Sequence, residues 1–135
     1  MSVQCEDFVH IAERLVLSES SEIARRVAAG RAYYGAYHCC RNLVDRQPSI
    51  DVNDRLGAHE RVYDAIGRLT LTFPGARELK KMAYKAMQIR DIRAVADYEL
   101  HGEFRFEQAQ QAIESAKIVH TLHLAFILKF AAQLT

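Results

Sequence analysis

The amino-acid sequence predicts an all-α fold, an up-and-down bundle of about five helices. Apolar residues recur at intervals of three and four along most of the chain, as they do on one face of a helix. Only residues 69–73 alternate in the manner of a strand, and an isolated strand would have no partner, so we interpret them as a helix end. At 135 residues, without an internal repeat or a linker, the chain is expected to form one domain over residues 1–135.

The helix around which the others are expected to pack runs from Ser20 or Ser21, which can cap its start, to about Arg46. Small residues at helical spacing mark one face, where another helix can approach closely: Ala28, Ala32, Gly35 or Ala36, Cys39 and Leu43. A second stripe carries larger and polar side chains: Val27, Arg31, Tyr34, His38 and Arg41. A helix that is apolar around most of its girth usually lies at the centre of a bundle, so these polar groups need partners or a function.

The same periodicity predicts four other helices, over residues 3–17, 59–69, 74–96 and 106–134. Loops are expected at residues 47–57, which contain a proline and a glycine, and at residues 97–105. Pro74 is expected in the first turn of its helix. The end of the last helix, residues 118–134, is apolar on more than one face. We therefore expect it to lie at the centre of the bundle or to pack against a second copy in a homodimer.

The composition argues against several classes of protein. The net charge is +1, so no overall field favours nucleic acid or an anionic membrane. The first residues do not resemble a signal peptide, and no apolar run is long enough to span a membrane. Three cysteines, two of them adjacent, do not form a disulfide framework. Reduced thiols and a cytoplasmic location are the expectation.

The residue spacing predicts neither a metal site nor a cofactor. Di-iron bundles use Glu-x-x-His pairs, which are absent, and the cysteines lack the spacing of a zinc site. His120 and His123 lie three residues apart, and we interpret them as a pair with satisfied hydrogen bonds near a helix interface. No glycine-rich phosphate-binding loop is present.

Two polar groups of residues remain as candidates for function. The first is the stripe with Arg31, Tyr34 and His38. The second lies where the fourth helix ends and the next loop begins, and contains Arg90, Arg93, Asp97 and Tyr98. The same helix has the strongest charge bias of the chain, six basic against two acidic residues over positions 77–93, and includes a basic patch at Lys81 and Lys85. A purely structural interpretation of the second group is a capping and salt-bridge cluster, in which Asp97 pairs with Arg31 or Arg93.

Two segments in these groups resemble a known family. They are Arg31-Ala32-Tyr33-Tyr34-Gly35-Ala36-Tyr37-His38 and, later in the chain, Arg93-Ala94-Val95-Ala96-Asp97-Tyr98. Together they resemble the HEPN domain family (higher eukaryotes and prokaryotes nucleotide-binding), closest to its small stand-alone bacterial branch, over roughly residues 3–128. The resemblance implies an all-α bundle of four to five helices, frequent homodimers and frequent pairing with a minimal nucleotidyltransferase. It also implies a link to toxin–antitoxin systems, because many members are metal-independent ribonucleases that act as toxins.

The ribonuclease motif of that family, R-N-x(3)-V-H-x-Y, is incomplete in this chain. Laid on residues 90–98, it matches Arg90, Val95 and Tyr98, but Asp91 replaces its asparagine and Ala96 its histidine. Alanine can neither accept nor donate a proton, so the acid–base role has no residue at that position.

The leading hypothesis is therefore a nucleotide- or RNA-binding, or protein-interaction, module without nuclease activity. Its expected ligand-binding residues are Arg31, Tyr34, Arg90, Arg93, Asp97 and Tyr98, next to the basic patch. The alternative is a metal-independent ribonuclease in which His38 takes the 2′-hydroxyl proton, with Arg31 and Tyr34 beside it. A third possibility is a purely structural helical partner of another protein.

Overall fold

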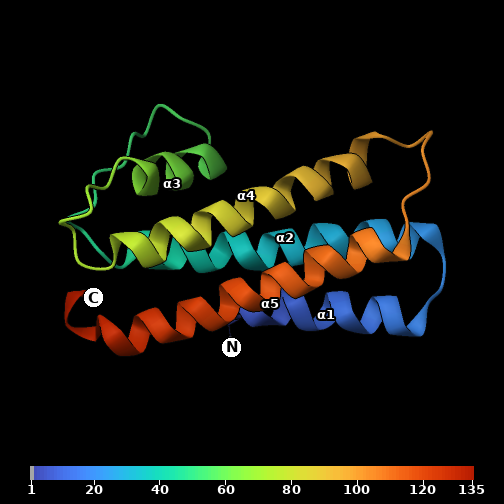
Figure 1. Ribbon diagram of the computed structural model, residues 1–135, viewed down its shortest axis with the longest axis horizontal. Coiled ribbons are helices and arrows are strands. Elements are labelled where there is room, and N and C mark those ends of the chain that lie inside the picture. The colour runs from blue at the N-terminus through green and yellow to red at the C-terminus, as the bar shows by residue number, and fades with distance from the viewer. Residues whose placement is uncertain (1) are drawn as a thin grey trace.

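The computed structural model describes residues 2–135, which form helices and loops without a strand (Figure 1). The elements in chain order are α1 (Cys5–Ser18), α2 (Glu22–Asp45), α3 (Ala58–Gly67), α4 (Ala76–Tyr98), α5 (Phe106–Lys129) and the short 3-10 helix η1 (Ala131–Gln133). The prediction of an all-α, up-and-down helical bundle is confirmed. None of the five α-helices is both long and apolar enough to cross a membrane.

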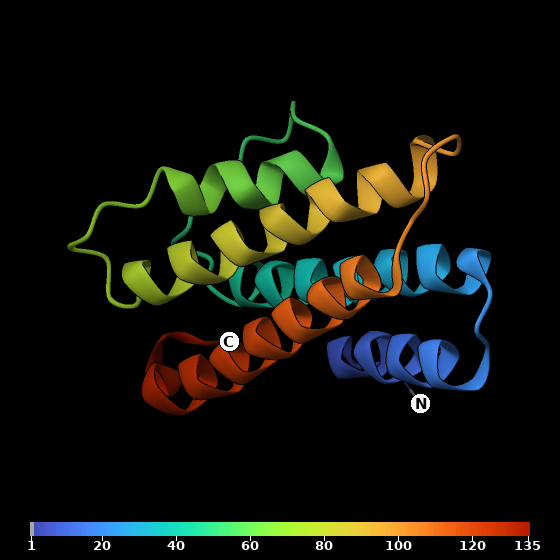
Figure 2. The ribbon, with the colours of Figure 1, turned by 45° about the vertical axis from the view of Figure 1, so that its right-hand side comes forward.

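Helix α2 lies in the middle of the bundle and packs against each of the other four α-helices. Helix α4 covers one side of it, α1 and α5 lie on the other, and α3 packs beside α4 (Figures 1 and 2). The Ser21 hydroxyl caps the start of α2 by accepting a hydrogen bond from the Ala24 amide at 3.2 Å. Ala32 and Ala36 are fully buried, as the small-residue face of this helix predicted.

Gly35 brings α1 close to α2. A Cβ atom at this position would lie 3.0 Å from Val9 Cγ2 and 3.1 Å from the backbone oxygen of Cys5, both on α1. Both distances are tighter than ordinary van der Waals contact, so a side chain here would push the two helices apart. The first turn of α1 is therefore held against the middle of α2.

Three predicted boundaries are wrong. Helix α4 begins at Ala76 rather than at Pro74, because Gly75 adopts a left-handed conformation (φ 88°) that a helix does not contain. Residues 69–73 form turns rather than a helix end. Helix α5 ends at Lys129 rather than at Leu134, and the chain then folds back, where the Gln133 side chain donates to Pro74 O at 3.0 Å and to Gln47 Oε1 at 2.9 Å.

The end of α4 also differs from the prediction, which put Asp97 and Tyr98 in a loop. The helix continues through Tyr98 because the buried guanidinium of Arg26, on α2, caps its carbonyl groups. Arg26 donates to Ala96 O at 2.7 Å and to Val95 O at 3.3 Å. The bond to Ala96 O supplies a partner for a carbonyl at the helix end, and Val95 O also accepts from the Glu99 amide at 3.0 Å. The last turn of α4, with its candidate residues, is thereby fixed to the central helix.

Candidate functional site

Four sequence-predicted residues meet where α4 ends beside α2, and we call them the arginine–tyrosine cluster: Arg31, Tyr34, Arg93 and Tyr98. The Arg31 guanidinium carbon lies 4.9 Å from the centre of the Tyr34 ring. The Arg93 guanidinium lies 5.7 Å from Tyr34 and 5.9 Å from Tyr98. These distances fall within the range of cation–π attraction. Both arginines thus lie within cation–π distance of Tyr34, and Arg93 also lies within that distance of the exposed Tyr98.

Asp97 pairs with Arg93 at 2.6 Å. The two residues lie four apart in the last turn of α4, so this contact also fits the structural interpretation of the segment as a salt-bridge cluster. It neutralises one of the three candidate arginines. Among residues 2–135, neither Arg31 nor Arg90 has a carboxylate within 4.0 Å. Those two side chains keep an uncompensated positive charge.

Arg90 is one turn before Arg93 on α4, and its guanidinium lies 5.5 Å from the ring of Tyr63 on α3. Tyr63 donates a hydrogen bond to the Tyr33 hydroxyl at 3.1 Å, and that hydroxyl is also hydrogen-bonded to His59 Nδ1 at 2.7 Å. Burial raises the pKa of Tyr63 and of Tyr33, and burial together with the charge of Arg93 lowers the pKa of His59. Arg90 and Arg93 therefore lie against uncharged aromatic side chains, those of Tyr63, Tyr33 and His59.

The sequence analysis did not identify the two aromatic side chains that α3 contributes to this group, Tyr63 and His59. The His59 ring stacks on Tyr37 at 3.8 Å between centroids, which fixes it against α2. No spacing rule relates residues of α3 to residues of α2 and α4, because the contact depends on how the loop at residues 46–57 returns the chain. These positions could be found only from the fold.

The basic patch is not part of the cluster. Nine residues separate Lys81 from Arg90, which at 3.6 residues per turn places them about 180° apart around α4. Lys85 lies four residues after Lys81 and so shares its face. A neighbouring lysine, Lys80, is engaged elsewhere: its ammonium donates to Gly67 O at 2.7 Å and caps the end of α3. A ligand bound by Arg90 and Arg93 would not contact Lys81.

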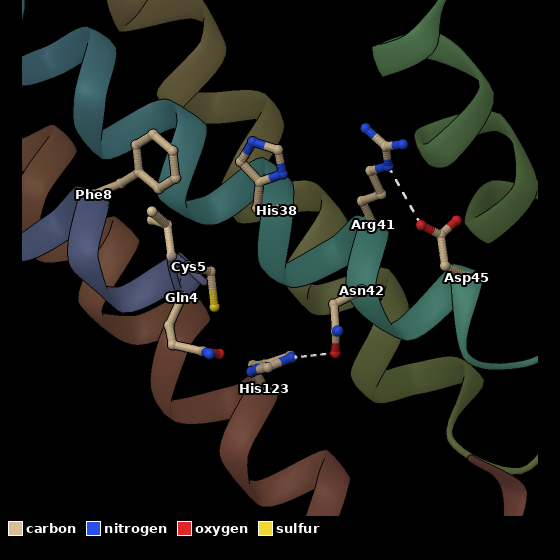
Figure 3. Close-up of a pocket in the computed structure, with 9 residues that line it drawn as sticks. Gln4, Cys5, Phe8, His38, Arg41, Asn42, Asp45 and His123 are labelled. Atoms are coloured by element: carbon tan, nitrogen blue, oxygen red, sulfur yellow. Dashed lines mark hydrogen bonds and ion pairs between the residues drawn. The ribbon is translucent and has the colours of Figure 1, made fainter. Parts of the chain in front are cut away.

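His38 lies away from Arg31. It stacks on Phe8 of α1 with 5.3 Å between ring centroids and lines a cavity of about 490 Å³ (Figure 3). Arg31 borders a different hollow, between α2 and the second half of α1, lined by Ile11, Arg14, Leu15, Leu17, Ser18 and Val27. Seven residues, about 10 Å along the helix axis, separate the two. Burial and the charge of Arg41 lower the pKa of His38, which suits a general base, but Arg31 does not share its cavity.

A second cluster consists of cysteine and histidine side chains of the kind that bind metal ions. The sequence analysis had predicted no metal site. Four residues each offer one ligand atom, and these four atoms lie within 4.8 Å of one another: Cys5 of α1, Cys39 of α2, and His120 and His123 of α5. Spacing rules did not reveal them, since they come from three helices. The only sequence signal was the pairing of His120 with His123 on one face of a helix.

Comparison of the chain with protein-family models, curated proteins and solved structures finds no match.

Proposed function

We propose that this protein is a HEPN-like binding module that holds a nucleotide or single-stranded RNA on the arginine–tyrosine cluster and Arg90, without cleaving it. One observation carries the proposal. Three arginines from two helices stand over tyrosine rings, while a single carboxylate, Asp97, pairs with one of them. Positive charge next to aromatic rings matches a ligand that has both phosphates and bases.

The two kinds of side chain suit the two parts of that ligand. Guanidinium groups bind phosphate oxygens through paired, charge-assisted hydrogen bonds, and Arg31 and Arg90 have no acidic side chain to compete for theirs. A base can stack on an exposed aromatic ring, which contributes about 1–3 kcal/mol per base. The Tyr98 ring is 74% exposed and lies beside Arg93, so it is the expected stacking platform.

The same geometry argues against cleavage. Ala96, at the position of the family's histidine, is 1% exposed and offers no titratable group. The His38 ring lies 6.5 Å from that of Tyr34, but His38 lines the cavity with Phe8. His59 lies 5.8 Å from Tyr34, but its Nδ1 is hydrogen-bonded to the Tyr33 hydroxyl and its ring is stacked on Tyr37. A general base must reach the proton that it removes, and a phosphate on Arg31 would lie away from His38.

Assembly belongs to the proposal as well. We expect a homodimer, because α5 leaves apolar side chains exposed at Ile118, Leu124 and Leu128, the last of them 84% exposed. A nucleotidyltransferase-type partner, implied by the family resemblance, would add a second protein to this assembly. Helix α5 and the end of α4 lie on opposite sides of α2 (Figures 1 and 2), so a partner bound to α5 would leave the arginine–tyrosine cluster free for a ligand.

A matched pair of charge reversals on α4 tests the binding face. Arg90→Glu is expected to weaken binding of a fluorescein-labelled single-stranded RNA about tenfold or more, because it removes a hydrogen bond to a charged group. It should also lower the salt dependence of binding by about one phosphate contact. Lys81→Glu changes the net charge equally but lies on the opposite face, and screening should limit its effect to about twofold. Fluorescence anisotropy at several salt concentrations measures both.

The comparison between the two variants decides the outcome. Equal weakening by Arg90→Glu and Lys81→Glu would mean that binding reflects overall charge and not the cluster. If neither the native chain nor the two variants bind RNA, the proposed function is wrong. Circular dichroism confirms that each variant keeps its helical content.

A further inference from the structure

Four side chains from three helices converge at the junction of α1, α2 and α5. They are Cys5, Cys39, His120 and His123, and one potential ligand atom from each, a sulfur or a ring nitrogen, lies within 4.8 Å of the other three. The two sulfur atoms are 2.8 Å apart, and both cysteines are free thiols. Cys39 and His123 are buried, and Cys5 and His120 are half-buried. The cluster is thus largely shielded from solvent.

Both histidines are oriented by an acceptor on one ring nitrogen. His120 Nε2 lies 2.9 Å from a carboxylate oxygen of Glu6, and His123 Nε2 lies 2.9 Å from Asn42 Oδ1 (Figure 3). Because Glu6 and Asn42 accept through oxygen, the ring proton resides on Nε2 in each case. The lone pair of each ring is then on Nδ1.

The two Nδ1 atoms are the notable feature of the cluster. Both are buried, and neither has a hydrogen-bond partner among the described residues. A buried polar atom without a partner is costly, and such atoms are rare in folded proteins. An imidazole whose N–H is held by a carboxylate or an amide oxygen, with its other nitrogen free, has the arrangement found for histidines that bind metals.

We propose that Cys5, Cys39, His120 and His123 bind one zinc ion, through the two sulfur atoms and the two Nδ1 atoms. Two thiolates and two imidazoles form a donor set that zinc prefers, and their number completes a tetrahedron. Binding releases the two thiol protons to solvent, so the two thiolates balance the charge of Zn²⁺. With all four positions taken by the protein, no site is left for water, and the role is structural rather than catalytic.

The position of the cluster indicates what the metal does. Helix α1 joins α2 through only three residues, 19–21, and its first turn carries Cys5. Gly35, one helical turn before Cys39, allows that turn to reach α2. A zinc ion shared by α1, α2 and α5 ties the N-terminal helix to the bundle. It also fixes one wall of the cavity that contains His38. This inference does not depend on the proposed RNA binding.

Metal content of the full chain tests the proposal. Protein produced with zinc in the medium and purified with a phosphine reductant should contain one zinc ion per chain by inductively coupled plasma mass spectrometry. Replacement of zinc by Co²⁺ should give the ligand-field and thiolate charge-transfer bands of a tetrahedral thiolate site. Cys39→Ala should lose the bound metal and these bands. Cys40→Ala, which changes the adjacent buried thiol, should keep both.

The histidine side of the site has its own matched pair. His120→Asn should lose most of the bound metal, whereas His101→Asn, in the exposed loop before α5, should retain all of it. A chelator should lower the melting temperature of the native chain and leave that of His120→Asn unchanged.

Two results would overturn the proposal. One is a native chain that binds neither zinc nor cobalt. This result counts whether Cys5 and Cys39 are free thiols or form a disulfide, and mass spectrometry distinguishes the two states. The other is undiminished metal binding by Cys39→Ala. If Cys39→Ala does not fold, the native stoichiometry, the cobalt spectrum and the two histidine variants still decide.

Discussion

Replacement of Arg26 by methionine is expected to destabilise the bundle by about 2–4 kcal/mol, because each buried carbonyl left without a donor costs about 1–3 kcal/mol. Arg26 is 6% exposed, and its guanidinium donates to four backbone carbonyls, those of Val95, Ala96, Glu99 and Gly102. Methionine fills a similar volume but donates nothing. The carbonyls of Ala96, Glu99 and Gly102 would then lose the Arg26 donor, whereas Val95 O keeps the Glu99 amide. Urea denaturation measures the change in the free energy of unfolding.

Arg41→Met is the matched control, since Arg41 lies on the same helix but is exposed and makes one pair with Asp45. It should cost no more than about 1 kcal/mol. The Arg26 variant should also bind RNA more weakly, because its cap holds the last turn of α4, with Asp97 and Tyr98. Equal stability of the two variants would show that Arg26 does not support this turn.

Replacement of Gly75 by alanine is expected to cost about 2–4 kcal/mol, from a left-handed backbone at a residue with a Cβ atom and from overpacking. Gly75 has φ 88°. An added Cβ would collide with the ring of Phe126 and lie 3.3 Å from Phe130 Cδ2, both at the end of α5. The start of α4 would have to move away from α5. The shift of the denaturation midpoint, at an unchanged slope, measures the cost.

Gly57→Ala provides the comparison, because Gly57 also precedes a helix. Its φ is −62°, and an added Cβ would meet no atom within 4 Å. It should change stability by no more than about 1 kcal/mol. A Gly75→Ala variant as stable as Gly57→Ala would mean that the turn before α4 can relax, and that its close packing on Phe126 is not required.

The helices were predictable from the sequence because their signals are local. Periodicity identified all five, Ser21 was recognised as a cap, and the small residues Ala32 and Ala36 marked the buried face of α2. Local signals do not predict a helix boundary that is set by a residue distant in the sequence. The end of α4 was misplaced because its cap, Arg26, lies about 70 residues earlier in the chain.

The candidate site divides in the same way. Arg31, Tyr34, Arg93 and Tyr98 were predicted from two segments, and these side chains do meet. The separation of Lys81 from Arg90 follows from helical geometry alone and could have been foreseen.

The metal-ligand cluster could not have been found from spacing. Three helices supply its members, and Cys5 reaches Cys39 only through the close approach at Gly35. A prediction based on ligand spacing is limited to sites built from one or two neighbouring segments.

The fate of a bound RNA tests the central claim, that the arginine–tyrosine cluster binds RNA without cutting it. A 5′-labelled single-stranded RNA is incubated with the native protein in the absence of divalent metal and analysed on native and denaturing gels. We expect a retarded band on the native gel and full-length RNA on the denaturing gel. Fragments that appear with the native protein and disappear with a folded His38→Ala or His59→Ala variant would contradict the claim.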